Sequence, residues 1–265
     1  MSASQESPAK GMASNRSVTR AVQVLRALAG SPAALTVSDI ARRIALPRAT
    51  TFRLLLTLEE EGMVDRQDTL YSLGWELGRL AQAVDPAAGL VPRIKDDLDA
   101  FADEVGETTT FSLRRGLFEL DLVYQANPRR LGMTMADLKG LTWPPHASST
   151  GKILLSELTP GEVGGTLSEP FAAVTPKTIT TRKALDEELA KVREQGWSVT
   201  DEELEEGMLS YAVPVRDAVG GLVGAISLVG PLARVRNIDT EANLTDRLKA
   251  AAERVRRRMT AVEAG

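Results

Sequence analysis

Arginine is concentrated in one stretch of the chain, in a pattern suited to binding phosphate. Between positions 16 and 56 there are seven arginines and one acidic residue, Asp39, so this stretch carries a charge of +6. Cations that meet phosphates supply most of the affinity of proteins for double-stranded DNA. We therefore expect this stretch to bind DNA. The alternative is that the arginines only solvate a small helical bundle.

The elements predicted around these arginines form a winged helix-turn-helix. Apolar residues recur at helical spacing over 17–29, 37–45 and 48–61. Ser17 is suited to cap the first helix and Thr36 or Ser38 the second, while Pro47 stands at the start of the third. Two short strands are predicted over 63–66 and 70–73. In such a module the third helix usually enters the major groove of DNA.

Candidate DNA contacts are found on all three helices and on the wing, which is the hairpin formed by the two predicted strands. Arg48, Thr50 and Arg53 project from the first turns of the third helix, the part that usually enters the groove. Phe52 beside them either packs under the wing, which we favour, or contacts a thymine methyl group. The residues predicted to bind DNA are Arg16, Arg20, Thr36, Ser38, Arg42, Arg43, Arg48, Ala49, Thr50, Thr51, Phe52, Arg53, Arg66 and Tyr71.

A second group of residues with binding chemistry is the run Ser148-Ser149-Thr150-Gly151, which opens a predicted helix. Free backbone N–H groups at a helix start, together with hydroxyls, can bind a carboxylate without any basic side chain. Ser227, on a predicted strand, is placed to donate a further hydrogen bond. The alternative is that Ser148 or Ser149 only caps the helix and that the backbone satisfies Ser227.

Several kinds of catalytic or metal site are excluded by composition and spacing. There is no cysteine and one histidine, His146, so multi-histidine and cysteine metal sites are excluded. A phosphate-binding loop fails because its first glycine would fall at His146. The acidic run 201–206 lacks EF-hand spacing and is predicted to be a solvated loop. We expect no metal and no cofactor.

An enzyme of the hydrolase class is the main alternative to a DNA-binding regulator. It would have to use His146 with Ser148 or Ser149, but no G-x-S-x-G motif is present. We expect His146 to be a structural or loop histidine and the protein not to be an enzyme. The alternative left open is a small-molecule hydrolase with an appended DNA-binding domain. A DNA binder that senses no ligand is a second alternative.

The length of 265 residues favours two domains. We predict a disordered tail over 1–15, the winged helix-turn-helix over 16–74, connector helices over 75–105, and an effector-binding and oligomerisation domain over 106–265. The net charge is −4, so the chain outside the arginine-rich stretch carries −10. No apolar run is long enough for a membrane span and no signal peptide is evident, so we expect a cytoplasmic protein that does not bind membranes.

The second domain is expected to mix strands and helices. Strands are predicted over 108–114, 118–126, 209–216 and 222–229, and helices over 148–157, 160–166, 181–195 and 239–261. Strands in this order, with helices between them, predict an α+β fold with a mainly antiparallel sheet.

Blocks of sequence in both halves of the chain resemble those of a known family. The first half contains SVTRAVQVLRAL (17–28), LTVSDIARRIALPRATTFRLLLTLEEEGMV (35–64) and YSLG (71–74). The second half contains HASSTGKILL (146–155), DEELEEG (201–207), YAVPVRD (211–217) and LVGAISLVGP (222–231). In content, order and approximate spacing, over nearly the whole chain, they resemble the IclR family of bacterial transcription regulators.

The resemblance implies a regulator with a GAF-like α/β effector domain that binds a small organic acid or aromatic metabolite. It further implies a near-palindromic operator bound by a homodimer or a dimer of dimers, and we expect a repressor of a catabolic or metabolic operon. Carried onto this chain, the family's effector contacts fall on Ser149, Thr150, Thr200, Ser210, Ser227 and Val229.

The chain departs from the family pattern at several of these positions. Members that bind small keto acids often have Gly-Ala at Ser149-Thr150, Asp at Thr200, Cys at Ser210 and Ser at Val229. The resemblance therefore does not imply a keto-acid ligand here. In the third helix, Ala49 and Phe52 replace the common Ser and His. The operator sequence is therefore not implied either.

Overall fold

The computed structural model describes residues 15–31, 33–83, 86–116, 118–129, 135–218 and 220–260. The chain divides into two compact units, Met1–Asp85 and Pro86–Gly265. The predicted tail lies outside the described residues except for Asn15. None of the described helices is long and apolar enough to cross a membrane.

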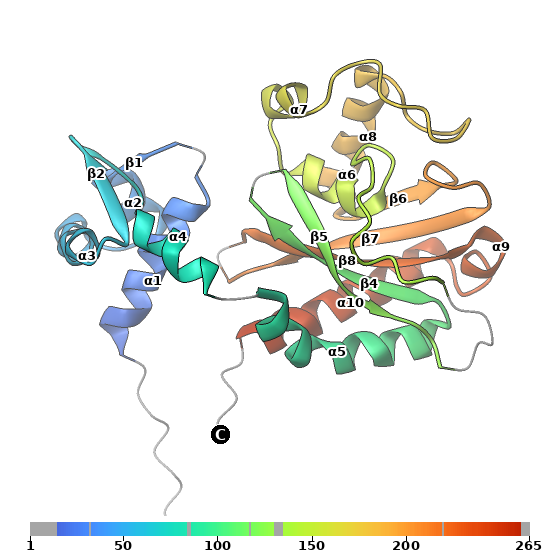
Figure 1. Ribbon diagram of the computed structural model, residues 1–265, viewed down its shortest axis with the longest axis horizontal. Coiled ribbons are helices and arrows are strands. Elements are labelled where there is room, and N and C mark those ends of the chain that lie inside the picture. Colours follow the sequence, from blue (N-terminus) through green and yellow to red (C-terminus); the bar gives the residue numbers. More distant parts are fainter. Residues whose placement is uncertain are drawn as a thin grey trace, which may run out of the picture. The chain divides into compact units, whose positions relative to one another are not determined.

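The first unit is the expected winged helix-turn-helix (Figure 1). Its elements are α1 (Arg16–Ala29), β1 (Leu35–Thr36), α2 (Val37–Arg43), α3 (Arg48–Glu60), β2 (Val64–Gln67), β3 (Leu70–Leu73) and α4 (Trp75–Gln82). The three strands form an antiparallel sheet in the order β1-β3-β2. Strand β1 is too short to be predicted from the sequence pattern.

Local side-chain contacts set the ends of these helices. The carboxamide of Asn15, not Ser17 as predicted, caps α1 by accepting the Ser17 N–H at 3.0 Å. Thr36 caps α2 by accepting the Asp39 N–H at 3.2 Å, one of the two predicted possibilities. After β3 the chain passes so close to Gly62 that a Cβ on Gly74 would lie 2.2 Å from the Gly62 carbonyl oxygen. Position 74 therefore requires glycine.

The second unit is built on a five-stranded antiparallel sheet in the order β5-β4-β8-β7-β6. The strands are β4 (Thr108–Arg115), β5 (Glu119–Ala126), β6 (Ser198–Asp201), β7 (Met208–Arg216) and β8 (Leu222–Pro231). The helices are α5 (Pro86–Val105), α6 (Ser149–Ser156), α7 (Pro160–Thr166), α8 (Arg182–Gln195), α9 (Leu232–Val235) and α10 (Glu241–Thr260). The predicted α+β fold is thus confirmed, with β6 and α9 added.

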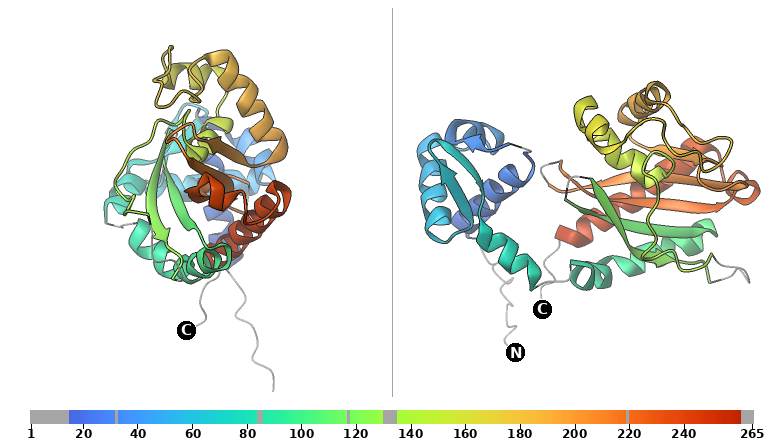
Figure 2. Two further views of the ribbon diagram at one scale, coloured as in Figure 1. Left: turned by 90° about the vertical axis from the view of Figure 1, so that its right-hand side faces the viewer. Right: turned by 45° about the horizontal axis from the view of Figure 1, so that its top comes forward.

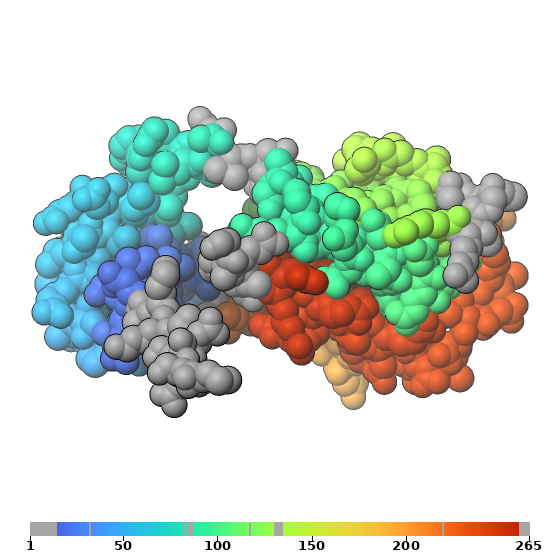
Figure 3. Space-filling model, turned by 90° about the horizontal axis from the view of Figure 1, so that it is seen from below, coloured from blue at the N-terminus to red at the C-terminus, as the bar shows by residue number. Residues whose placement is uncertain are grey.

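Helices cover both faces of this sheet. Helices α5 and α10 lie against one face, while α6, α7 and α8 lie on the other (Figures 1 and 2). Figure 3 looks onto α5 and α10, which run side by side. Because side chains alternate along a strand, Phe111 and Leu113 of β4 face these two helices and Thr110 and Ser112 face the opposite side.

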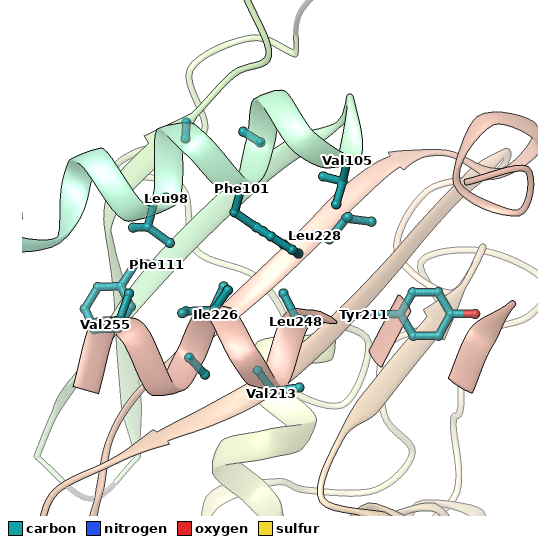
Figure 4. Packing of buried hydrophobic residues seen from close by; sticks show 14 of the residues in the cluster. Leu98, Phe101, Val105, Phe111, Tyr211, Val213, Ile226, Leu228, Leu248 and Val255 are labelled. Carbon is teal, nitrogen blue, oxygen red and sulfur yellow. The ribbon is translucent and has the colours of Figure 1, made fainter. Parts of the chain in front are cut away.

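The main hydrophobic core lies between the sheet and the helix pair α5 and α10. Leu98 and Phe101 of α5 pack with Ile226 of β8 and with Leu248 and Val255 of α10 (Figure 4). The prediction of connector helices over 75–105 was therefore wrong for α5, which is part of the core of the second unit. Only α4 groups with the winged helix. Periodicity identified both helices but not the partner that each packs against.

Candidate DNA-binding surface and candidate effector cavity

The third helix presents one face to the core and another to solvent. Thr51, Leu55 and Leu58 of α3 are buried, at the spacing of one helical stripe. Arg48, Ala49, Phe52 and Arg53 are exposed on the other side of the helix. The helix that the sequence assigned to the major groove thus offers both cationic and apolar groups to a partner.

The cations of this unit differ in whether an acid already holds them. Arg42 lies 2.6 Å from the Asp39 carboxylate. Among the residues that the structure describes, the guanidinium groups of Arg16, Arg20, Arg48 and Arg53 have no carboxylate within ion-pair distance. Cations that are not neutralised within the protein are free to meet phosphates.

Other predicted DNA-binding side chains take part in contacts within the unit. Arg43 donates a 3.4 Å hydrogen bond to the Ala27 carbonyl, at the end of α1. Arg66 donates to the Asp68 carbonyl at 2.8 Å, and its guanidinium lies 5.6 Å from the centre of the Tyr71 ring. These contacts hold Arg66 in place on the wing. Ser38 is exposed at the start of α2.

Two predicted contacts are contradicted by burial. Tyr71 is 1% exposed and belongs to the core cluster of the winged helix, and Thr51 is fully buried with its hydroxyl donating to the Pro47 carbonyl at 3.2 Å. Both side chains therefore stabilise the unit, and of the two only the Tyr71 ring also borders a surface groove. For Tyr71 the error arose because the wing was assigned as DNA-facing without separating the two faces of β3.

Phe52 also departs from the favoured interpretation. It is 38% exposed and is not among the residues of the buried cluster. Phe52 lines a groove that is formed by residues of α2, α3 and the wing. The lining residues are Thr36, Val37, Ser38, Arg48, Ala49, Phe52, Arg66, Thr69 and Tyr71.

In the second unit, all six residues carried over from the family resemblance line one cavity of about 460 Å³. They come from the start of α6, from β6, from β7 and from β8. Further polar lining comes from Thr110 and Ser112, which the alternation of β4 could have revealed. Apolar lining that was not predicted comes from Leu122, Met135, Leu138, Trp143, Val174, Leu204, Met208 and Leu209.

Four of the hydroxyls that line the cavity form two pairs. The Oγ atoms of Ser149 and Ser210 are 2.8 Å apart, and Thr110 Oγ1 lies 2.6 Å from Ser227 Oγ. Ser227 is thus satisfied by a side chain and not by backbone. Each pair joins neighbouring elements: α6 to β7, and β4 to β8. A hydroxyl both donates and accepts, so each pair keeps capacity for a ligand.

The start of α6 forms one end of this cavity. Ser148 is the N-cap, since its Oγ accepts the Gly151 N–H at 3.1 Å. That leaves the N–H groups of Ser149 and Thr150 without an acceptor among the residues the structure describes. A Cβ on Gly151 would lie 2.4 Å from Pro145 atoms, so glycine lets the preceding loop pack against the helix.

Behind the cavity, a buried ion pair joins α6 to the acidic run. Lys152 is fully buried, and its Nζ lies 2.6 Å from Glu203 Oε1, 2.9 Å from the Val199 carbonyl oxygen and 3.5 Å from Glu188 Oε1. Lys152 is therefore a buried salt-bridge residue. Burial raises the pKa of Glu203, against the opposing effect of the Lys152 charge.

The acidic run 201–206 is not the solvated loop that the sequence predicted. Asp201 pairs with Arg236 at 2.6 Å, and Glu202 pairs with Lys177. The hydroxyl of Thr178 donates to the Glu203 carbonyl at 2.6 Å. The run is therefore fixed at several points, and its residues Leu204 and Glu205 form part of the cavity lining. Glu205 is the one charged side chain among the described lining residues.

His146 has structural contacts. Its Nε2 lies 3.0 Å from the Ala172 carbonyl oxygen, and its ring lies 5.2 Å from that of Phe171. Nδ1 is buried and has no hydrogen-bond partner in the described part of the chain. Ser148 uses its hydroxyl to cap α6. This arrangement gives no support to the hydrolase alternative.

A winged helix-turn-helix with exposed arginines on α3, carried in one chain with a hydroxyl-lined cavity, is typical of a regulator that binds DNA. Two family models match the chain: the IclR helix-turn-helix domain over residues 17–68, and the bacterial transcriptional regulator IclR C-terminal domain over residues 84–257. The protein belongs to the IclR family of bacterial transcriptional regulators.

Individual relatives are similar over most of their length. An HTH-type transcriptional regulator of Mycobacterium tuberculosis is 32% identical over 90% of each chain. The transcriptional repressor IclR of Escherichia coli is 29% identical over 86% of this chain and 84% of its own. The crystal structure of an IclR homologue from Microbacterium hydrocarbonoxydans, complexed with 4-hydroxybenzoate, is 28% identical. It covers 93% of this chain and all of that one (100%), with a TM-score of 0.58.

Proposed function

We propose that this regulator is a repressor that binds a small organic acid or aromatic compound in the 460 Å³ cavity and responds by changing its affinity for an operator. The observation that carries the proposal is the convergence of six residues, from α6, β6, β7 and β8, on that one cavity. The effector-binding residues are Ser149, Thr150, Thr200, Ser210, Ser227 and Val229.

The chemistry of the cavity supports a ligand with a carboxylate and an apolar ring. The free N–H groups of Ser149 and Thr150 suit a carboxylate, because the start of a helix favours negative charge. The apolar lining, with Trp143 and Leu138 among its residues, suits an aromatic ring. The hydroxyl pairs can hydrogen-bond a further polar substituent.

The first compound to test is 4-hydroxybenzoate, since a related structure contains it. A ligand at about 100 times its Kd stabilises the folded state by about 2.7 kcal/mol. For a unit of this size we expect the Tm of the second unit to rise by about 5–10 °C. Panels of aliphatic and other aromatic acids follow in the same assay.

Matched serine variants separate binding in the cavity from binding elsewhere. Ser149→Ala and Ser227→Ala remove hydroxyls of the lining, and we expect each to reduce the shift in Tm. Ser168→Ala changes an exposed serine outside the cavity and should leave the shift unchanged. If no acid in a broad panel stabilises the protein, a DNA binder that senses no ligand becomes the better account.

For the coupling between ligand and operator, we infer a homodimer or dimer of dimers that binds a near-palindromic site. Ligand binding would favour one arrangement of the two winged helices, so that the operator half-sites are matched or missed. Sedimentation of the full chain with and without operator DNA gives the oligomeric state. A monomer on DNA would contradict this part of the proposal.

A further inference from the structure

The solvent-facing side of α3 carries apolar side chains where polar ones are expected. Ala49, Phe52 and Leu56 follow one another at helical spacing on this side, and all three are exposed. Phe52 is 38% and Leu56 37% exposed. An amphipathic helix normally presents polar groups to solvent. The apolar groups here lie among cations, with Arg48 and Arg53 on the same helix.

The surroundings of Phe52 indicate which partner covers it. The groove that contains Phe52 and Ala49 is also lined by Arg48 and Arg66, and no acidic side chain is among its described lining residues. Arg66 is held in position by the Asp68 carbonyl and by the Tyr71 ring. A partner of this groove therefore combines negative charge at the edges with an apolar group at the centre.

Double-stranded DNA meets both requirements at a thymine. The methyl group on C5 of thymine is the apolar group that base edges present in the major groove, and phosphates flank the groove on either side. We propose that Phe52, supported by Ala49, recognises the methyl group of one thymine in each operator half-site. This inference rests on the proposed operator binding and adds the base-specific contact.

The test removes only the methyl group. Operator sequences are first obtained by selection of random duplex DNA with the full-length protein. Each thymine is then replaced, one at a time, by deoxyuridine, which keeps the base pairing. One buried methyl group corresponds to about a fourfold change in Kd. We expect the wild-type protein to lose about fourfold in affinity at one thymine per half-site, and Phe52→Ala to bind both DNAs equally at that position.

A matched variant controls for the loss of a phenylalanine. Phe118 is 42% exposed on the second unit, and Phe118→Ala should keep the wild-type response to deoxyuridine. The inference is overturned if the wild-type protein binds every deoxyuridine duplex as tightly as the parent. It is also overturned if Phe52→Ala stays as sensitive as the wild type. Failure of the selection to yield any preferred sequence would count against operator binding itself, and the inference would fall with it.

Discussion

Arginines in the winged helix differ in whether a carboxylate already pairs with them. This difference predicts how much each one contributes to DNA affinity. Arg42 forms an ion pair with Asp39, whose pKa is lowered chiefly by the Thr36 hydroxyl and also by Arg42. Arg53 has no carboxylate partner in the described part of the chain and lies on the exposed side of α3. An unpaired cation gains more from a phosphate or a base edge than a paired one does.

We therefore predict that Arg53→Ala shifts operator footprinting to higher protein concentration while the protein stays folded. A lost base contact costs about 1–3 kcal/mol, which is about a 5- to 150-fold increase in Kd. Arg42→Ala serves as the comparison and should cost less, because Asp39 already holds that cation. Footprinting titrations, with circular dichroism as the check on folding, measure both. Unchanged binding by Arg53→Ala would show that α3 is not the helix that reads the operator.

At the scale of elements, one buried ammonium group fixes the frame of the cavity. Lys152 of α6 bonds to β6 through Val199, to α8 through Glu188 and to the acidic run through Glu203. An ammonium group has three hydrogens to donate, and these three acceptors use them all. The elements that carry Ser149, Thr200 and Leu204 into the cavity lining are therefore held by the same side chain.

We predict that Lys152→Met destabilises the second unit by about 3–5 kcal/mol, because it leaves the buried Glu203 carboxylate unpaired. The double variant Lys152→Met/Glu203→Gln removes both charges and should recover most of that loss. Urea unfolding of the three proteins measures the effect. If the double variant were no more stable than Lys152→Met, the loss would stem from packing of the lysine side chain and not from the stranded charge.

The raised pKa of Glu203 predicts a particular dependence of stability on pH. The charged groups that face it are Lys152 and Glu188. Because burial raises the folded-state pKa above the unfolded value, the folded state binds more protons between the two values. The contribution of Glu203 to stability is therefore complete below the unfolded pKa and declines as pH rises through the folded pKa.

The comparison that isolates this contribution is Glu203→Gln, which does not titrate. We expect the stability of the wild-type protein relative to Glu203→Gln to fall as pH rises from about 4, near the unfolded pKa of a glutamate, toward neutrality. Urea midpoints of both proteins across that range give the difference. Parallel curves for the two proteins would show that Glu203 keeps its ordinary pKa in the folded state.

Patterns within single elements made much of the fold predictable, and contacts between elements limited the rest. Periodicity placed α3, α7 and β3 within a residue of their observed bounds. It assigned α5 to a connector because the sequence does not show which face of a helix finds a partner. It also left Tyr71 among the DNA contacts, since burial depends on how β3 packs against the helices.

The lining of the candidate cavity could be predicted in part from the sequence, whereas the buried ion pair behind it could not. The family resemblance supplied its six polar and apolar positions, and the alternation of β4 could have added Thr110 and Ser112. The burial of Glu203 with Lys152 could not be predicted from the sequence. The run 201–206 has five acidic residues and one leucine, a composition that is also typical of a solvated loop. Only the fold brings α6 and the residues after β6 together.

At the scale of the whole molecule, charge is divided sharply along the sequence. The stretch from 16 to 56 carries +6, whereas the rest of the chain carries −10. The overall charge of −4 therefore conceals a cationic region that attracts DNA and an acidic remainder that repels it. This division restricts non-specific binding to one part of the chain.

We predict a strong dependence of operator affinity on salt, with each phosphate contact contributing about −0.9 to the slope of log K against log salt concentration. Arg20→Ala should reduce the magnitude of that slope by about 0.9 if Arg20 binds one phosphate. Arg115→Ala, on the acidic second unit, should leave the slope unchanged. Fluorescence anisotropy at several salt concentrations measures all three proteins, and equal slopes for wild type and Arg20→Ala would remove Arg20 from the phosphate contacts.

The paired hydroxyls of the cavity bear on how this protein can evolve. Thr110 with Ser227, and Ser149 with Ser210, form a recognition surface from uncharged groups whose hydrogens rotate. Exchanges of serine for alanine, cysteine or glycine, or of threonine for valine, alter such a surface by one or two atoms and strand no buried charge. On the proposed function, single substitutions can thus change which effector the cavity binds, while the ion pair behind the cavity stays unchanged.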